Sequence, residues 1–131
     1  MTRSVEKELF LQPLPKLAAR LRRDRRLGRA WQVIEKDYAD CDLSLETAAR
    51  ESGMSRNHLN VILRESTGLT FYQLLIRYRL SRAMTMIEFS NRNLLEIALE
   101  NGFGSLNSLE IHFRRLIGTS PKQFRNSRGL R

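Results

Sequence analysis

A short stretch near the middle of the chain carries amide, aliphatic and guanidinium side chains at spacings that a helix brings to one face. An asparagine amide can form two hydrogen bonds with the edge of adenine, and a valine side chain can contact the methyl group of thymine. Asn57, Asn60 and Val61 are therefore candidates for reading bases. Arg56 and Arg64 are candidates for binding phosphates, contacts that position a helix on DNA without specifying its sequence.

These side chains need a helix whose opposite face is buried, and the surrounding sequence predicts one. Ser55 is a good N-cap for a helix over residues 56–66. Leu59, Ile62 and Leu63 then form its inward stripe. The polar side chains are left pointing outward, as on the second helix of a helix-turn-helix unit.

The stretch belongs to a pattern that occurs twice in the chain. Ala49 and Gly53 precede it, at the spacing that Ala98 and Gly102 show about fifty residues later. A small alanine lets two helices approach closely, and a glycine allows the positive φ of a tight turn. This repeat predicts two helix-turn-helix units. With one residue inserted in the second copy, the further matches are Met54 with Phe103, Leu59 with Leu109, Leu63 with Phe113, Arg64 with Arg114, Gly68 with Gly118, and Thr70–Phe71 with Ser120–Pro121.

The second unit has candidates of its own on the helix that Ser105 opens. Asn93 caps the helix before it, and the amide groups at a helix N-terminus favour an anion. The base-reading candidates of this unit are Asn107, Ser108, Glu110 and Ile111. Beyond Arg56 and Arg64, the phosphate candidates of the whole chain are Ser55, Asn93, Ser105, Arg115, Lys122 and Arg125.

This arrangement closely resembles the DNA-binding domain of the AraC/XylS family of bacterial transcription regulators. The motifs cover roughly residues 27–126, and the closing run is highly specific for the family. The repeat and the resemblance together predict an all-α fold of about seven helices, in which a long central helix joins two helix-turn-helix subdomains. The resemblance also implies a structural position for Arg79. The motifs are Ala49-x3-Gly53-Met54-Ser55-x3-Leu59, Arg79-x3-Ala83, and Ile97-Ala98-x3-Gly102-Phe103 running on to Gly118-x-Ser120-Pro121-x2-Phe124-Arg125.

The sequence departs from the family pattern on both candidate reading helices. The family commonly carries arginine at the positions of Val61 and Ile111, so neither helix has an arginine there to bind guanine, and Glu110 adds a negative charge. Three consequences stay open. Glu110 could accept a hydrogen bond from cytosine while Ile111 contacts thymine. Alternatively, the second unit could contact mainly the DNA backbone, or, ranked below these two, its face could bind another protein.

The predicted elements divide the chain into four parts. Residues 1–25 form a basic and apolar arm or linker, in which Pro13 and Pro15 block a continuous helix. Residues 26–70 form the first subdomain, residues 71–89 the connecting helix, and residues 90–131 the second subdomain with a basic tail. About nineteen residues make a helix roughly 28 Å long, against about 34 Å between major-groove faces one turn apart.

The net charge of +9 suggests a polyanionic partner, and the charge is concentrated at the two ends. Residues 1–30 have a net charge of +6, residues 31–113 of −3, and residues 114–131 carry six basic residues and no acid. We interpret the arginine-rich run between residues 16 and 29 as a solvated, partly helical linker, in preference to a contact with the DNA backbone.

The sequence gives little support to catalysis. Cys41 is the only nucleophile candidate, and His58 and His112 lie on helices that the repeat assigns to other work. There is no glycine-rich phosphate loop or metal-spaced cluster, so we expect no enzyme activity, cofactor or metal. A single cysteine excludes an internal disulfide. No apolar run is long enough to cross a bilayer and no apolar signal-peptide region is visible, so a cytoplasmic, nucleoid-associated location is expected.

The leading hypothesis is sequence-specific binding of double-stranded promoter DNA by a transcription regulator, with its two recognition helices in successive major grooves. The resemblance implies activation more than repression, and RNA polymerase as a partner. We expect a monomer, either as a free-standing activator or as part of a regulator with a separate effector-binding and dimerisation domain. The alternative is a protein-interaction module that uses the apolar side chains of Val5, Leu9, Phe10 and Leu11.

Overall fold

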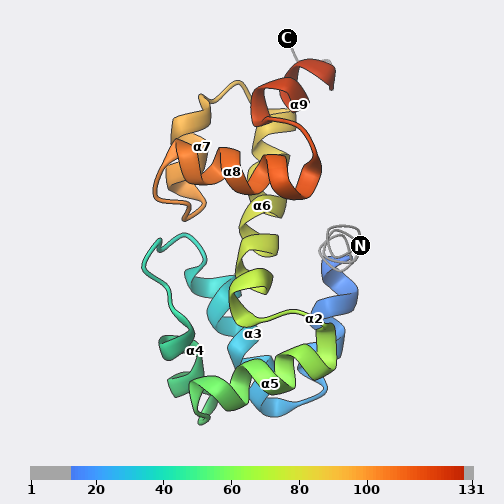
Figure 1. Cartoon of the computed structure of the whole chain (residues 1–131), viewed down its shortest axis with the longest axis vertical. Coiled ribbons are helices and arrows are strands. Elements are labelled where there is room, and N and C mark those ends of the chain that lie inside the picture. Colours follow the sequence, from blue (N-terminus) through green and yellow to red (C-terminus); the bar gives the residue numbers. More distant parts are fainter. Residues whose placement is uncertain (1–12, 129–131) are drawn as a thin grey trace. The chain divides into compact units, whose positions relative to one another are not determined.

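The computed structural model describes residues 13–128, which form α-helices joined by short turns (Figure 1). This range contains eight helices and no strand, so the all-α prediction is confirmed, with one helix more than the expected number of about seven. The helices are α2 (Leu14–Arg22), α3 (Arg25–Asp37), α4 (Leu45–Ser52), α5 (Arg56–Thr67), α6 (Phe71–Phe89), α7 (Leu94–Glu100), α8 (Leu106–Ile117) and α9 (Pro121–Ser127).

The described residues divide into two compact units. Unit 1 consists of the chain up to Tyr38 together with Leu43–Tyr78, and unit 2 consists of Ala39–Asp42 together with the chain from Arg79 onward. The 19-residue helix α6 is continuous across this division, so its first two turns belong to unit 1 and the rest to unit 2. Its bounds are those predicted for the connecting helix. None of the helices between residues 13 and 128 combines the length and the apolar character that a membrane span requires.

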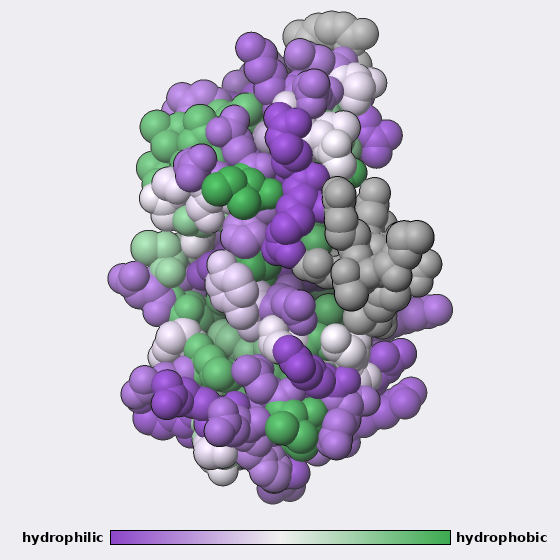
Figure 2. All heavy atoms as spheres, in the orientation of Figure 1, coloured by the Kyte–Doolittle hydropathy of each residue, from purple (hydrophilic) through white to green (hydrophobic). Residues whose placement is uncertain are grey.

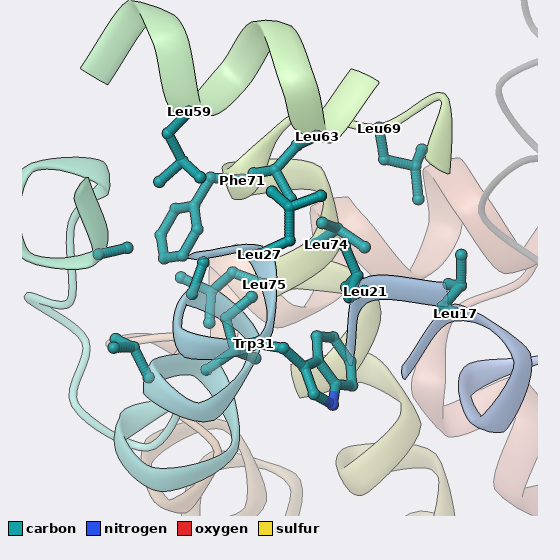
Figure 3. Close-up of a cluster of buried hydrophobic side chains, with 14 of the residues drawn as sticks. Leu17, Leu21, Leu27, Trp31, Leu59, Leu63, Leu69, Phe71, Leu74 and Leu75 are labelled. Carbon is teal, nitrogen blue, oxygen red and sulfur yellow. The ribbon is translucent and has the colours of Figure 1, made fainter. Parts of the chain in front are cut away.

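The core of unit 1 is built from leucine side chains of α2, α3, α5 and α6 around Trp31 (Figure 3). Trp31 is only 2% exposed and meets the Tyr78 ring edge-on, with ring centroids 5.6 Å apart and planes at 85°. Such an aromatic pair contributes about 0.5–1.5 kcal/mol beyond the area it buries. This core holds α5 from behind and leaves the other face of α5 in solvent.

For residues 13–25, the helix α2 corrects the expectation that residues 1–25 form an arm or linker. Leu17 and Leu21 lie four residues apart on one face of α2, and both are fully buried in the core of unit 1. Arg20 Nη1 also donates a hydrogen bond to the carbonyl oxygen of Ser66 on α5, at 3.1 Å. This segment is therefore part of the unit that carries the first helix-turn-helix.

The two prolines that argued against a helix stand where it begins. Pro13 is the N-cap of α2 and Pro15 lies in its first turn, where a missing N–H costs no intrahelical hydrogen bond. The arginine-rich run is two helices that meet at Asp24, whose carboxylate caps α3. Our interpretation of this run as a solvated linker is wrong, because buried leucines alternate with its arginines. Residues 1–12 lie outside the described range.

The two helix-turn-helix turns have the same backbone geometry, as the repeat predicts. In each turn the residue after the glycine donates a hydrogen bond to an alanine carbonyl, at 3.0 Å from Met54 to Ala49 and at 3.0 Å from Phe103 to Ala98. The glycines adopt positive φ, 70° at Gly53 and 84° at Gly102. A side chain with a Cβ is strained in this region, so both glycines are required by the turn.

Unit 2 has a core of its own beneath α8. Phe113 is fully buried and meets the Phe124 ring at a centroid distance of 5.4 Å and an interplanar angle of 69°. Arg79 on α6 is 4% exposed and its Nη2 donates to the carbonyl oxygen of Asp40 at 2.8 Å. The structural position that the resemblance implies for Arg79 is thus confirmed, because its guanidinium group holds the loop that follows α3.

Candidate nucleic-acid interface

The exposed face of α5 carries most of the candidates in the first unit. Arg56, Asn57 and Arg64 are exposed, and Val61 is 54% exposed although its side chain is purely apolar. Asn57 and Val61 are one turn apart, and Arg64 follows on the same side. The α5 surface therefore offers an amide, an aliphatic group and a cation in a row.

The exposed face of α8 offers an amide and an aliphatic group at the matched positions of the second unit. Asn107 and Glu110 are exposed, Ile111 is 55% exposed, and Ser108 is half-buried. Figure 2 shows a small apolar patch over α5 and another over α8, each among hydrophilic side chains. The exposed large apolar side chains of these two helices are Val61 and Ile111.

The local hydrogen bonds that position these two helices are also repeated. The helices α5 and α8 have 12 residues each. Each begins with a serine whose Oγ accepts a backbone N–H bond, at 3.1 Å for Ser55 and 3.0 Å for Ser105. Each ends at a left-handed glycine, Gly68 with φ of 81° and Gly118 with φ of 102°. Side chains at matched positions of the repeat therefore stand at the same turn of each helix.

Asn60 is the one base-reading candidate that the structure places elsewhere. Its side chain is half-buried, and Oδ1 accepts a hydrogen bond from the backbone N–H of Phe71 at 2.9 Å. That N–H belongs to the first turn of α6, where it has no partner within the helix. Asn60 thus ties α5 to the start of α6 through its Oδ1 atom, and its role in reading a base stays a prediction.

The second unit needs no such tie, because its chain carries a proline at the matching place. Pro121 corresponds to Phe71 and has no N–H to satisfy. Glu110, which corresponds to Asn60, is accordingly left exposed on α8. The two faces are therefore alike at three matched pairs, Asn57/Asn107, Val61/Ile111 and Arg64/Arg114, and differ at others, among them Asn60/Glu110.

The exposed basic residues among the phosphate candidates are Arg56, Arg64, Arg115 and Lys122. Arg115 Nη2 lies 3.4 Å from Nδ1 of His112, one turn earlier on α8. The hydroxyl oxygens of Ser55 and Ser105 accept the capping bonds, which leaves each O–H able to donate one hydrogen bond. These side chains remain candidates for holding the DNA backbone.

Two further phosphate candidates are occupied by structural contacts. Arg125 is half-buried and its Nε donates to the carbonyl oxygen of Ile87 on α6 at 2.9 Å, so it holds α9 within unit 2. Asn93 accepts the backbone N–H of Glu96 at 2.8 Å and donates Nδ2 to the carboxylate of the same residue at 3.1 Å. Hydrogen bonds from Arg92 to Glu100 and Glu96 add to this cluster and raise the pKa of Arg92. These contacts give both side chains a structural role, and their binding of phosphate stays a prediction.

Arg114 is a candidate that our sequence reasoning missed. It corresponds to Arg64 in the repeat, and both arginines are exposed in the last turn of their helices. The internal repeat already pairs Arg64 with Arg114, so a phosphate contact predicted for Arg64 should also have been predicted for Arg114. Arg114 therefore completes the row that Asn107 and Ile111 begin.

The turn that contains Cys41 holds the residues nearest to a metal-binding group in the described chain. The ligand atoms of Asp40, Cys41 and Asp42 lie within 4.8 Å of one another, and all three residues are exposed. Asp40 Oδ1 already accepts the backbone N–H of Asp42 at 2.9 Å. An exposed acidic turn of this kind is common without an ion, and we assign it no metal.

His112 makes unit 2 sensitive to acid. Burial lowers the pKa of His112 below its ordinary value of 6.5, and the charges of Arg115 and Arg79 lower it further. The unfolded chain therefore takes up this proton first, so stability is fully present above about pH 6.5 and declines as the pH falls below it. Replacing His112 with Ile, the residue at the matched position 62, should flatten this decline between about pH 7 and 5.5, as measured by urea unfolding. An unchanged pH dependence in His112→Ile would show that other groups cause it.

Comparisons with known proteins agree with this arrangement. Residues 48–127 match the family model described as a helix-turn-helix domain. An uncharacterized HTH-type transcriptional regulator of Staphylococcus aureus strain COL is 30% identical over 105 residues, which are 80% of this chain and 14% of that protein. The chain thus spans only a small part of the curated relatives that it matches.

Two solved structures are similar over most of their length. The C-terminal domain of AraT, a response regulator from Geobacillus stearothermophilus, has a TM-score of 0.78 and 27% identity, covering 82% of this chain and 89% of that one. The DNA-binding domain of AdpA, a global transcriptional factor crystallised in complex with a target DNA, has a TM-score of 0.72 and 31% identity, covering 79% of this chain and 92% of that one. The helices that carry the exposed rows are part of a known architecture.

Proposed function

Since the chain belongs to the AraC-type family of helix-turn-helix transcription regulators, we propose that it binds double-stranded DNA sequence-specifically through the exposed faces of α5 and α8. The family consists of DNA-binding domains rather than enzymes. The observation that carries the proposal is the row of amide, aliphatic and guanidinium side chains on α5, repeated on α8. Within each row, the amide and the aliphatic group suit base edges and the arginine suits a phosphate.

The placement of the helices in successive major grooves is part of this proposal. The N-terminal part of a recognition helix contacts base edges in the major groove. Asn57 and Asn107 are both the second residue of their helices, which suits that role. The 19-residue helix α6 joins the two units covalently, so both reading helices can follow one duplex.

The cellular role is proposed on the same basis. We propose a cytoplasmic, nucleoid-associated regulator of transcription that activates promoters through contact with RNA polymerase. The segment itself acts as a monomer in this proposal, because its two reading helices are covalently joined by α6. An effector-binding or dimerisation domain would belong to a longer protein, as the 14% coverage of the S. aureus relative illustrates.

Selection from a randomised duplex library tests the function. We expect two short conserved blocks about ten base pairs apart. Asn57→Ala should blur one block and Asn107→Ala the other, with affinity for the selected site falling about 5- to 150-fold, because a bidentate base contact is worth about 1–3 kcal/mol. The affinities are measured at several salt concentrations.

Arg64→Ala is the matched control for a backbone contact. It should weaken binding to all sequences alike and reduce the salt slope by about one. If Asn107→Ala, like Arg64→Ala, weakens binding to all sequences alike, the second unit contacts only the DNA backbone and does not recognise bases. No enrichment at all, with a steep salt slope, contradicts sequence-specific binding.

A further inference from the structure

We propose that the DNA site consists of two related A·T-containing half-sites, each recognised through a thymine methyl group, and that only the half-site read by α8 also requires a cytosine. This inference rests on the proposed function and specifies its substrate. It follows from comparing the two reading helices position by position.

The first step is the match between the two rows. Asn57 and Asn107 occupy the same helical position, and Val61 and Ile111 occupy the same position one turn later. Asparagine pairs with the N6 and N7 groups of adenine, whereas an aliphatic side chain can contact the C5 methyl group of thymine. Because both units carry the same pair of groups at the same spacing, both half-sites should contain adenine and thymine at the same separation.

The second step is the exposure of the aliphatic side chains. Val61 is 54% exposed and Ile111 is 55% exposed, so each presents apolar area that water covers in the free protein. Neither side chain can form a hydrogen bond with guanine or with phosphate. In the major groove, the thymine methyl group is the apolar partner that a base pair offers. Removing both apolar surfaces from water favours thymine over the other bases at this position.

The third step is the difference between Asn60 and Glu110. The Oδ1 atom of Asn60 accepts the N–H of Phe71, whereas the carboxylate of Glu110 is exposed beside Ile111. A carboxylate accepts a hydrogen bond from the N4 amino group of cytosine and repels phosphate. A cytosine is therefore expected next to the thymine contact in one half-site and not in the other.

Replacement of thymine by deoxyuridine tests the methyl contacts, because it removes the C5 methyl group and keeps base pairing. In the site selected by the protein, deoxyuridine in place of the contacted thymidine of either half-site should lower the affinity about four-fold. This corresponds to about 0.8 kcal/mol per methyl group. Val61→Ala should abolish the effect of uridine in one half-site and Ile111→Ala in the other. If a site is selected but uridine has no effect in either half-site, the methyl contacts are disproved while the proposed function stands. If no site is selected, the proposed function fails as well.

Base substitution at the predicted cytosine tests the asymmetry. Glu110→Ala should remove the preference for cytosine at one base pair in one half-site and leave the other half-site unchanged. Glu65→Ala removes an exposed carboxylate from α5 and controls for the change in charge, so it should leave every base preference intact. A cytosine preference that persists in Glu110→Ala, or that occurs equally in both half-sites, disproves this part of the proposal.

Discussion

Replacing Phe113 with Ala should lower the free energy of unfolding of unit 2 by about 3–5 kcal/mol, the range typical of buried aromatic truncations. Phe113 is fully buried beneath α8 and packs edge-on against Phe124 at 5.4 Å, so the substitution leaves a cavity and breaks an aromatic pair. A loss of this size is a large fraction of the stability of a small domain. Urea unfolding followed by circular dichroism measures it.

The single tryptophan makes this experiment specific for each unit. Trp31 lies in the core of unit 1, so its fluorescence follows the unfolding of that unit. Phe113→Ala should shift the circular dichroism transition more than the fluorescence transition, and Leu63→Ala, at the matched buried position of α5, should shift the fluorescence transition. Ile111→Ala is the control on α8, because an exposed side chain changes stability by no more than about 0.5 kcal/mol. A loss below about 1 kcal/mol in Phe113→Ala would contradict the buried packing.

Breaking α6 should have the largest effect on DNA binding. Proline at position 81 removes an intrahelical hydrogen bond and clashes with the preceding turn, which costs about 3 kcal/mol or more and kinks the helix. Ser81 lies in the interior of the 19-residue α6, close to the division between the two units. In the proposed function α6 couples the two reading helices, so a break in it should weaken their joint binding to one duplex. Affinity for a site with both blocks should fall about 10²- to 10⁴-fold, the usual gain from linked binding.

Ser81→Ala is the matched control, because alanine favours the helix and removes only the hydroxyl group. It should bind like the unchanged protein. The measurement compares a duplex with both blocks and a duplex with one, after circular dichroism has shown that the Ser81→Pro variant is folded. Equal affinity of Ser81→Pro and Ser81→Ala for the two-block duplex would show that α6 does not set the spacing.

The elements that could be predicted from sequence are those with a local chemical cause. The two turns follow from Ala-x3-Gly in the repeat, and their φ angles of 70° and 84° agree with it. The N-caps Ser55, Asn93 and Ser105 all accept the expected backbone hydrogen bonds. Two capping boxes could also have been predicted from the sequence but were not. Thr70 pairs with Gln73 at 2.9 and 3.2 Å, and Ser120 pairs with Gln123 at 3.1 Å in both directions.

The contacts that could not be predicted are those of side chains whose partners are distant in sequence. Leu17 and Leu21 were visible at helical spacing, but only the packing of α2 in the core of unit 1 shows that they are buried. Asn60 looks like a groove-facing amide on a helical wheel, yet the backbone N–H of Phe71 draws its side chain away. Arg125 similarly bonds a carbonyl oxygen 38 residues away. No local pattern encodes such contacts, so sequence reasoning assigned these polar groups to a ligand.

Pro121 has no backbone N–H, whereas the matched residue Phe71 has one. This difference affects how the DNA specificity of the two reading helices could be redesigned. Position 60 has a structural task, so its side chain is not free to vary without disturbing the start of α6. Position 110 does not have to accept such a hydrogen bond, because Pro121 has no backbone N–H. Substitutions at position 110, whether engineered or natural, should therefore change the base preference of α8 without destabilising unit 2. A Phe71→Pro exchange would not extend this freedom to the first helix, because the Phe71 side chain is fully buried in the core of unit 1.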